Sequence, residues 1–213
     1  MSRGRATITA LYPPAPAEYF ERDARLMARA LIGAHLVRYQ DGEARVARIV
    51  ETEAYRGPRD AACHARVGLT PRTRSLLGPP GHAYVFLVYG MHECFNVVCY
   101  RDGGGHAVLL RAGEPILGVI GRTDGPGRLA RALGITRADD GVDLTHPPTY
   151  ISARGVEHHP GPRIGVTPRV GVAYAGADAD RPWRFYDAAS RHVSRPPKSA
   201  IGRGLWPSHP DQR

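Results

Sequence analysis

Two carboxylates separated by a single residue stand in the segment RIVETEAY, residues 48–55. Alternate side chains of a β-strand share a face, so we expect Glu51, Glu53 and Tyr55 to project together, with the carboxylates about 6–7 Å apart. At this spacing one carboxylate can shift the pKa of the other, which is how a general base is often adjusted. On these residues alone, an exposed edge strand with solvated acids explains the pattern slightly better.

An aromatic hairpin is predicted from the segment AYVFLVYGM, residues 83–91. Strand parity places Tyr84 and Phe86 on one face and Tyr89 on the other, beside Gly90. A tyrosine that a turn exposes is a poor core residue, and in a basic protein it is a candidate wedge between base pairs. The alternative is a partly exposed tyrosine that lies over the sheet edge, which is commoner in general.

The segment GLTPRTR, residues 68–74, is a polar and basic loop. Thr70, Arg72 and Arg74, together with backbone N–H groups, are suited to contact phosphate oxygens. A solvated loop without a partner is the alternative interpretation.

Cysteine and histidine usage gives no sign of a metal site. The three cysteines, Cys63, Cys94 and Cys99, include no C-x-x-C pair, which argues against a disulfide scaffold and a cysteine zinc site. We expect buried or idle thiols. His158 and His159 lack a partner at ligand spacing, so solvent exposure is expected there, with no metal and no cofactor.

The charge balance of the 213-residue chain suggests an anionic partner, because Lys+Arg is 29 and Asp+Glu is 20. Nucleic acid is the commonest such partner, and residues 61–92 contain no acidic side chain. All but one of the cations are arginines, which genome composition alone could explain.

A hydrophobic content of 42% excludes a wholly disordered chain. The longest apolar stretch, residues 83–91, is far shorter than the ~20 residues of a membrane span. The N-terminus lacks an apolar signal region. We therefore expect a soluble intracellular protein.

The elements that must position these residues indicate one α+β domain with a largely antiparallel sheet and few helices. The expected elements are a helix over 23–32, strands over 35–39, 44–55, 83–88, 95–100 and 107–111, a helix over 127–133, an irregular excursion over 145–168, and late strands over 169–173 and 183–186. Asp41-Gly42 is a hairpin signal between the first two strands. Residues 1–16 are expected to form a loose arm, 17–195 the folded domain and 196–213 a basic Pro-rich tail.

Taken together, several segments resemble the alkyladenine (3-methyladenine) DNA glycosylase family. They are ALIGAHLV at 30–37, residues 48–58, TPR at 70–72, GHAYVFLVYGMH at 81–92, Asn96, VLLR at 108–111, GPGRL at 125–129 and RVGV at 169–172. The pairing of the ETEAY core with the YGMH hairpin makes chance a poor explanation. The resemblance implies a compact domain with a curved sheet that cleaves the N-glycosidic bond of alkylated or deaminated purines. Such a base must first be flipped out of the duplex.

The resemblance also implies catalytic roles. Glu53 is the expected general base that activates water, and Arg111 is expected to help hold that water. Glu51 is expected to be structural or to modify its neighbour. The single lysine, Lys198, lies in the Pro-rich tail, a poor place for an activated amine. We therefore expect a monofunctional enzyme that uses water rather than a Schiff base.

The base pocket is implied in the same way. Tyr55 and His64 are expected to sandwich the base, with Phe86 at a third position, and cationic purines stack well on aromatic faces. Asn96 is expected to exclude guanine by clashing with its 2-amino group. Tyr89 is expected to fill the gap that the flipped nucleotide leaves. Phe86 departs from the family, which often has tyrosine there, so neutral substrates such as hypoxanthine are expected to suffer more than cationic ones.

Two other functions stay open. The first is a glycosidase of free nucleosides or sugars that uses Glu51 and Glu53 as an acid/base pair. The second is a non-catalytic protein that binds damaged or unusual DNA. For the glycosylase, the expected partner is double-stranded DNA with damaged purines, the protein is a monomer, and no membrane is involved.

Overall fold

The computed structural model describes residues 3–100, 102–153 and 162–194. Within these residues one sheet contains eight strands: β1 (His35–Gln40), β2 (Glu43–Arg56), β3 (Ala83–Val88), β4 (His92–Cys99), β5 (His106–Leu117), β6 (Thr149–Ser152), β7 (Ile164–Thr167) and β8 (Arg184–Asp187). The α-helices are α1 (Arg3–Leu11), α2 (Ala24–Ala30) and α3 (Pro126–Leu133). His158, His159, Lys198 and the predicted tail lie outside the described residues.

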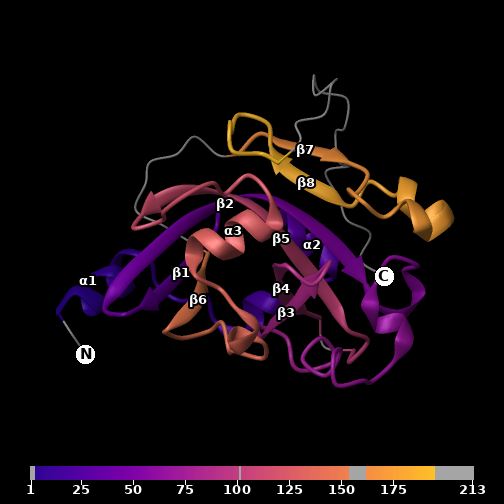
Figure 1. The fold of residues 1–213 in the computed structure, drawn as a ribbon, viewed down its shortest axis with the longest axis horizontal. Coiled ribbons are helices and arrows are strands. Elements are labelled where there is room, and N and C mark those ends of the chain that lie inside the picture. Colours follow the sequence, from indigo (N-terminus) through magenta and orange to yellow (C-terminus); the bar gives the residue numbers. More distant parts are fainter. Residues whose placement is uncertain (1–2, 101, 154–161, 195–213) are drawn as a thin grey trace.

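The sheet is antiparallel throughout its described pairings and runs in the order β3-β4-β5-β2-β1-β6. Strand β8 pairs with both β2 and β7. In Figure 1 β2 is a long, bent strand that arches across the molecule, with β7 and β8 along its outer side. The predicted α+β class with a curved, mostly antiparallel sheet is confirmed.

The local signals for turns and helix ends are also confirmed. Asp41 and Gly42 have φ angles of 53° and 83°, so both central residues of the β1–β2 turn are left-handed, as its twist requires. Asp23 caps α2 by accepting a hydrogen bond from the backbone N–H of Arg25 at 2.9 Å. Helix α3 ends at Gly134, whose φ is 70°. No helix of the described part of the chain is both long and apolar enough to cross a bilayer.

Helix α2 covers one face of the sheet and so decides which face remains for function. Met27 of α2 is fully buried in the main hydrophobic core. The Thr52 hydroxyl on β2 donates to the Ala28 carbonyl at 2.8 Å. Because neighbouring side chains on a strand alternate, Glu51 and Glu53 point away from α2, toward the opposite face.

The prediction of a loose N-terminal arm over residues 1–16 is wrong for its described part, because residues 3–11 form α1. Tyr12 is buried beside Val37 and Tyr150 of strands β1 and β6. Ala15 is also buried, and its N–H donates to the Ile151 carbonyl at 2.8 Å. These contacts with the distant β6 order a segment whose own periodicity is weak.

Two late segments also differ from prediction. The range 145–168, predicted to be irregular, contributes β6 and β7, which add to β1 and β8. Residues 169–173, predicted to be a strand, have no strand pairing in the structure. The Val170 N–H donates a hydrogen bond to the Glu53 side chain there instead of to a neighbouring strand. The predicted strand over 183–186 is confirmed as β8.

Candidate active site

Strand register gathers residues that are distant in sequence onto the sheet face opposite α2. Tyr84 pairs with Asn96, Asn96 pairs with Leu109, and Leu109 pairs with Glu53. Directly paired residues of antiparallel strands point to the same face. A single row across β3, β4, β5 and β2 therefore carries side chains from four segments.

A β-bulge brings Arg111 to this face. Glu51 pairs with Ala112 and Thr52 pairs with Leu110, so Arg111 is an extra residue of β5 between two paired positions. Its Nε donates to the Glu51 Oε1 at 2.7 Å, and its Nη1 lies 3.2 Å from the Glu53 Oε1. The bulge thus points one guanidinium at both carboxylates.

Glu53 is fully buried and held by three groups. Besides Arg111, the Val170 N–H donates to Oε1 at 2.7 Å and the Tyr55 hydroxyl donates to Oε2 at 2.9 Å. Burial raises the pKa of Glu53, and these donors and the Arg111 charge offset that effect only in part, while the Glu51 charge adds to it. The prediction that Glu53 and Tyr55 share a face is confirmed. The alternative of solvated acids on an edge strand is wrong, because β2 has strand partners on both sides.

Glu51 has a different environment although it lies two residues away. Its Oε1 accepts from Arg111, from the Arg184 Nε at 2.7 Å and from the Ser194 hydroxyl at 2.9 Å. Its Oε2 accepts from the Ser194 N–H at 2.6 Å. Burial alone would raise the pKa of Glu51, but the charges of Arg111 and Arg184 outweigh it and the pKa is lowered. Glu51 is an ionised anchor, whereas Glu53 is the carboxylate that can take up a proton.

A cavity of about 900 Å³ opens on this face, within the size range of small-molecule sites. The residues predicted for the pocket and for catalysis line it, with the exception of Glu53 itself: Tyr55, His64, Phe86, Asn96 and Arg111. The three residues that hold Glu53 also line the cavity, since Val170 joins Tyr55 and Arg111 there. Glu53 therefore lies directly behind the cavity wall.

The aromatic walls of the cavity contact one another. The rings of His64 and Phe86 are 4.6 Å apart at 75°, and Phe86 stacks on Tyr84 at 5.2 Å. The His64 Nδ1 lies 2.9 Å from the Tyr84 hydroxyl, which fixes the imidazole. Burial, aided by the nearby Arg72 charge, lowers the pKa of His64, so a neutral imidazole faces the cavity at physiological pH.

Asn96 is fixed within this wall. It is buried on β4, and its Nδ2 donates to the Tyr84 carbonyl at 2.9 Å. A side chain held by the backbone of the next strand cannot rotate away from a molecule that enters the cavity without loss of that bond.

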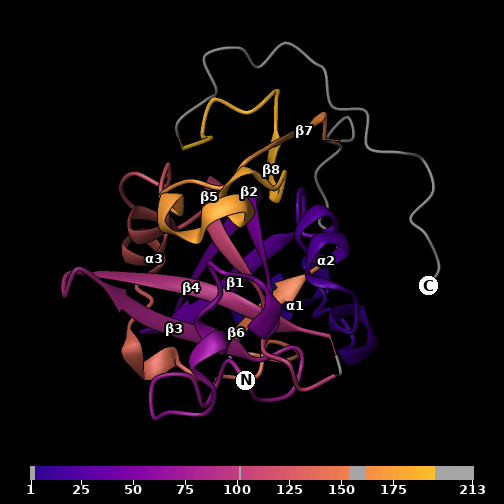
Figure 2. The same cartoon turned by 90° about the vertical axis from the view of Figure 1, so that its right-hand side faces the viewer.

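Tyr89 lies in the loop that closes the β3–β4 hairpin, which projects beyond the body of the molecule in Figure 2. It is 89% exposed, so it does not lie over the sheet edge. Its φ of 52° puts a bulky residue in the left-handed region, which costs roughly 1–3 kcal/mol. The fold therefore holds an aromatic ring in solvent, in a strained backbone conformation, at the rim of the cavity that Tyr89 also lines.

The basic loop over 68–74 meets the cavity at Arg72. Arg72 is exposed, lines the cavity and has its guanidinium 5.4 Å from the Phe86 ring centre. Arg74 is exposed, and the Thr70 hydroxyl is paired with Thr73 at 2.9 Å. The cysteines are buried and free, as expected.

Several residues of the site were not predicted from the sequence. Val170 acts through its backbone N–H, which has no signature in residue type. Arg184 and Ser194 reach Glu51 from the far end of the chain. Arg128 and Arg131 of α3 line the cavity as well. Their spacing of three residues could have indicated that both side chains lie on one face of a helix.

Comparison with known proteins shows which family the chain resembles. A family model described as methylpurine-DNA glycosylase matches residues 18–191. A protein of Anaeromyxobacter dehalogenans strain 2CP-1, named "Putative 3-methyladenine DNA glycosylase", is 52% identical over 188 residues, which cover 87% of each chain. Proteins of the same name are 50% identical over 184 residues in Myxococcus xanthus (85% of this chain, 94% of that one) and 45% identical over 200 residues in Methanocella arvoryzae (86% and 96%).

Proposed function

The chain belongs to the methylpurine-DNA glycosylase family and is a DNA glycosylase, and from that premise we propose that it hydrolyses damaged purines from duplex DNA with a water activated by Glu53. The observation that carries the proposal is a fully buried carboxylate of raised pKa, held by three groups directly behind a cavity with aromatic walls. A raised pKa brings a carboxylate closer to the pH at which a general base works best.

In the proposed reaction, the oxygen of the water bonds to C1′ of the deoxyribose as the bond from C1′ to the purine nitrogen breaks. The electron pair of that bond leaves with the purine, and a proton of the water passes to Glu53. A purine alkylated at N3 or N7 is cationic before the bond breaks and neutral afterwards, so it leaves without an added proton. Arg111, anchored by Glu51, would hold the water beside Glu53.

Base flipping is proposed because the cavity is recessed in the protein surface, so that a base that stays stacked in the duplex cannot enter it. The exposed and strained Tyr89 at the hairpin tip supports a wedge that fills the vacated stack. The neutral imidazole of His64 supports binding of cationic alkylpurines, since a charged imidazole would repel them.

Replacing Phe86 with tyrosine tests substrate preference. Stacking is retained and a hydroxyl is added to the cavity wall, so release of cationic 3-methyladenine should be nearly unchanged. Release of neutral hypoxanthine should rise about two- to tenfold, the worth of one hydrogen bond. Single-turnover rates on duplexes with one lesion each measure this. Equal changes for both lesions would contradict the proposed role of the missing hydroxyl.

Salt dependence tests the DNA face. The logarithm of the association constant for duplex DNA should fall steeply with the logarithm of salt concentration, by about 0.9 for each phosphate contact. Arg74→Ala should reduce the magnitude of this slope by about 0.9, the contribution of one phosphate contact. Arg29→Ala on α2, which covers the opposite face of the sheet, is the matched control and should leave the slope unchanged. A slope near zero for the unaltered chain would remove the case for a phosphate-binding face.

The glycosidase of free nucleosides is distinguished by its substrate. It needs two carboxylates as acid and base, but Glu51 accepts four hydrogen bonds and has a lowered pKa, which disfavours a proton donor. The experiment compares kcat/KM for a methylated purine nucleoside and for the same lesion in duplex DNA. Preference for duplex supports the proposal, and equal rates on the nucleoside favour the alternative.

A further inference from the structure

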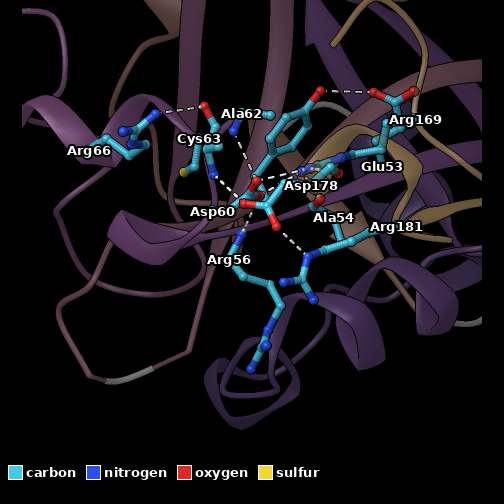
Figure 3. Close-up of polar contacts among 12 residues, drawn as sticks. Glu53, Ala54, Arg56, Asp60, Ala62, Cys63, Arg66, Arg169, Asp178 and Arg181 are labelled. Atoms are coloured by element: carbon cyan, nitrogen blue, oxygen red, sulfur yellow. Dashed lines mark hydrogen bonds and ion pairs between the residues drawn. The ribbon is translucent and has the colours of Figure 1, made fainter. Parts of the chain in front are cut away.

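A second charged pair lies behind the cavity and does not contact it. Arg169 and Asp60 form an ion pair whose side chains are both fully buried. The two guanidinium Nη atoms bind the two carboxylate oxygens at 2.6 and 2.9 Å. Figure 3 shows Asp60 at the centre of a set of dashed contacts, with Arg56, Ala62 and Cys63 around it.

Asp60 organises the chain that leads to the His64 wall. Its Oδ2 accepts from the Arg56 N–H at 3.1 Å, and its Oδ1 accepts from the Ala62 N–H at 3.0 Å. The first bond holds the end of β2, directly after Tyr55. The second holds the turn that precedes His64. Asp60 is thus the point at which two segments of the cavity wall are joined.

Arg169 organises the opposite wall. Its guanidinium donates to the carbonyls of Ala54 and Asp178 at 3.0 and 3.1 Å. Its central carbon also lies 4.8 Å from the ring centre of Tyr55 and 4.9 Å from that of Trp183. These partners hold the side chain of residue 169, and the next residue is Val170, whose N–H donates to Glu53.

We infer that the buried Asp60–Arg169 pair is a positioning device for the general base, which sets the Val170 N–H and the Tyr55 hydroxyl against Glu53. The inference rests on the proposed function. Two of the three groups that hold Glu53 are linked to this pair: Val170 follows Arg169 in the chain, and the Tyr55 ring lies against the Arg169 guanidinium. The third group, Arg111, is anchored separately by Glu51.

Arginine is required here by geometry. A lysine at position 169 keeps the charge, but one ammonium cannot span both carboxylate oxygens, reach two carbonyls and stay close to two ring centres. Arg169→Lys should therefore let the Val170 N–H move away from Glu53 while the fold is kept. A displacement of about 1 Å can cost roughly 100-fold in rate.

The test measures the single-turnover rate of purine release per folded molecule, its pH dependence and the affinity for undamaged duplex. Arg169→Lys should lower the rate by about 10- to 100-fold. Affinity should be unchanged, because neither side chain of the pair is exposed. The acid limb of the rate profile should move to higher pH, because the Val170 N–H is one of the groups that lower the pKa of Glu53.

That shift is diagnostic because the other charged and titratable groups around Glu53 are retained in the variant. They are Arg111 and Glu51 beside it, Tyr55 on its own strand, Cys94 on β4, and Tyr174. Arg38→Lys is the control: it weakens a largely buried ion pair between β1 and Asp139, and neither of these two residues lines the cavity. It should lower thermal stability with no change in rate or pH profile.

The outcomes separate this inference from the proposed function. A native rate in Arg169→Lys overturns the inference, as does a loss of rate with an unshifted acid limb or an equal loss in Arg38→Lys. Absence of release by the unaltered chain overturns the proposed function instead. Should Arg169→Lys fail to fold, Asp60→Asn, which keeps the shape of the side chain and removes its charge, takes its place with the single-turnover rate as its readout, and a native rate there overturns the inference.

Discussion

Replacing Glu53 with glutamine is expected to lower the single-turnover rate of purine release by about 10²–10⁴-fold, the usual contribution of a general base. Glutamine has nearly the same shape, and its carbonyl oxygen can still accept one hydrogen bond. It cannot accept the proton that, in the proposed reaction, water gives up when it attacks C1′. The loss is therefore expected in the chemical step, which single-turnover release of free base from methylated duplex measures.

The same variant should bind damaged duplex as well as the unaltered chain and should not be less stable. Burial raises the pKa of Glu53 in the folded state, so the ionised carboxylate lowers stability at pH values above its ordinary pKa. Glutamine removes that charge. A thermal midpoint at or above that of the unaltered chain would separate a catalytic defect from a folding defect. Release by Glu53→Gln at the unaltered rate would move the general base elsewhere.

Replacing Glu51 with glutamine is expected to have a large effect of a different kind, a loss of about 3–5 kcal/mol in the free energy of unfolding. The substitution leaves the buried guanidinium groups of Arg111 and Arg184 without their shared carboxylate. Denaturant unfolding at neutral pH measures the loss. Glu114→Gln is the control, since this carboxylate pairs with Arg48 but is one-third exposed, and its removal should cost much less.

The pH dependence gives Glu51 a second signature. Its pKa is lower in the folded chain than in the unfolded one, so its stabilising contribution is complete above the ordinary glutamate pKa. That contribution is lost as the pH falls through the folded-state pKa. Stability of the unaltered chain should therefore decline over this acidic range more steeply than that of Glu51→Gln. Unfolding curves of equal free energy for the two chains would show that Glu51 is not an anchor.

Local sequence signals predicted the elements that have local causes. The Asp41-Gly42 turn has residues that tolerate a positive φ, and the cap of α2 is a contact between residues 23 and 25. Strand alternation, which depends only on residues close in sequence, placed Glu53 and Tyr55 on one face. The resemblance to a known family then supplied expected roles that these short-range arguments left open.

Features with long-range causes could not be predicted. Whether β2 is an edge strand depends on β8, more than 100 residues away in the chain, and its pairing buries the two carboxylates. The position of Arg111 depends on a bulge that breaks strand parity. The Val170 N–H is a backbone group, and the expected strand at that position is absent because side chains replace strand pairing.

The most direct measurement is a product analysis of methylated duplex DNA after incubation with the unaltered chain. Hydrolysis of the N-glycosidic bond predicts free methylated purine in solution, together with an abasic strand that remains unbroken until alkali or heat is applied. The same incubation with Glu53→Gln should yield neither product above background. A strand that breaks without alkali, or the absence of free base from the unaltered chain, would contradict a water-using purine glycosylase.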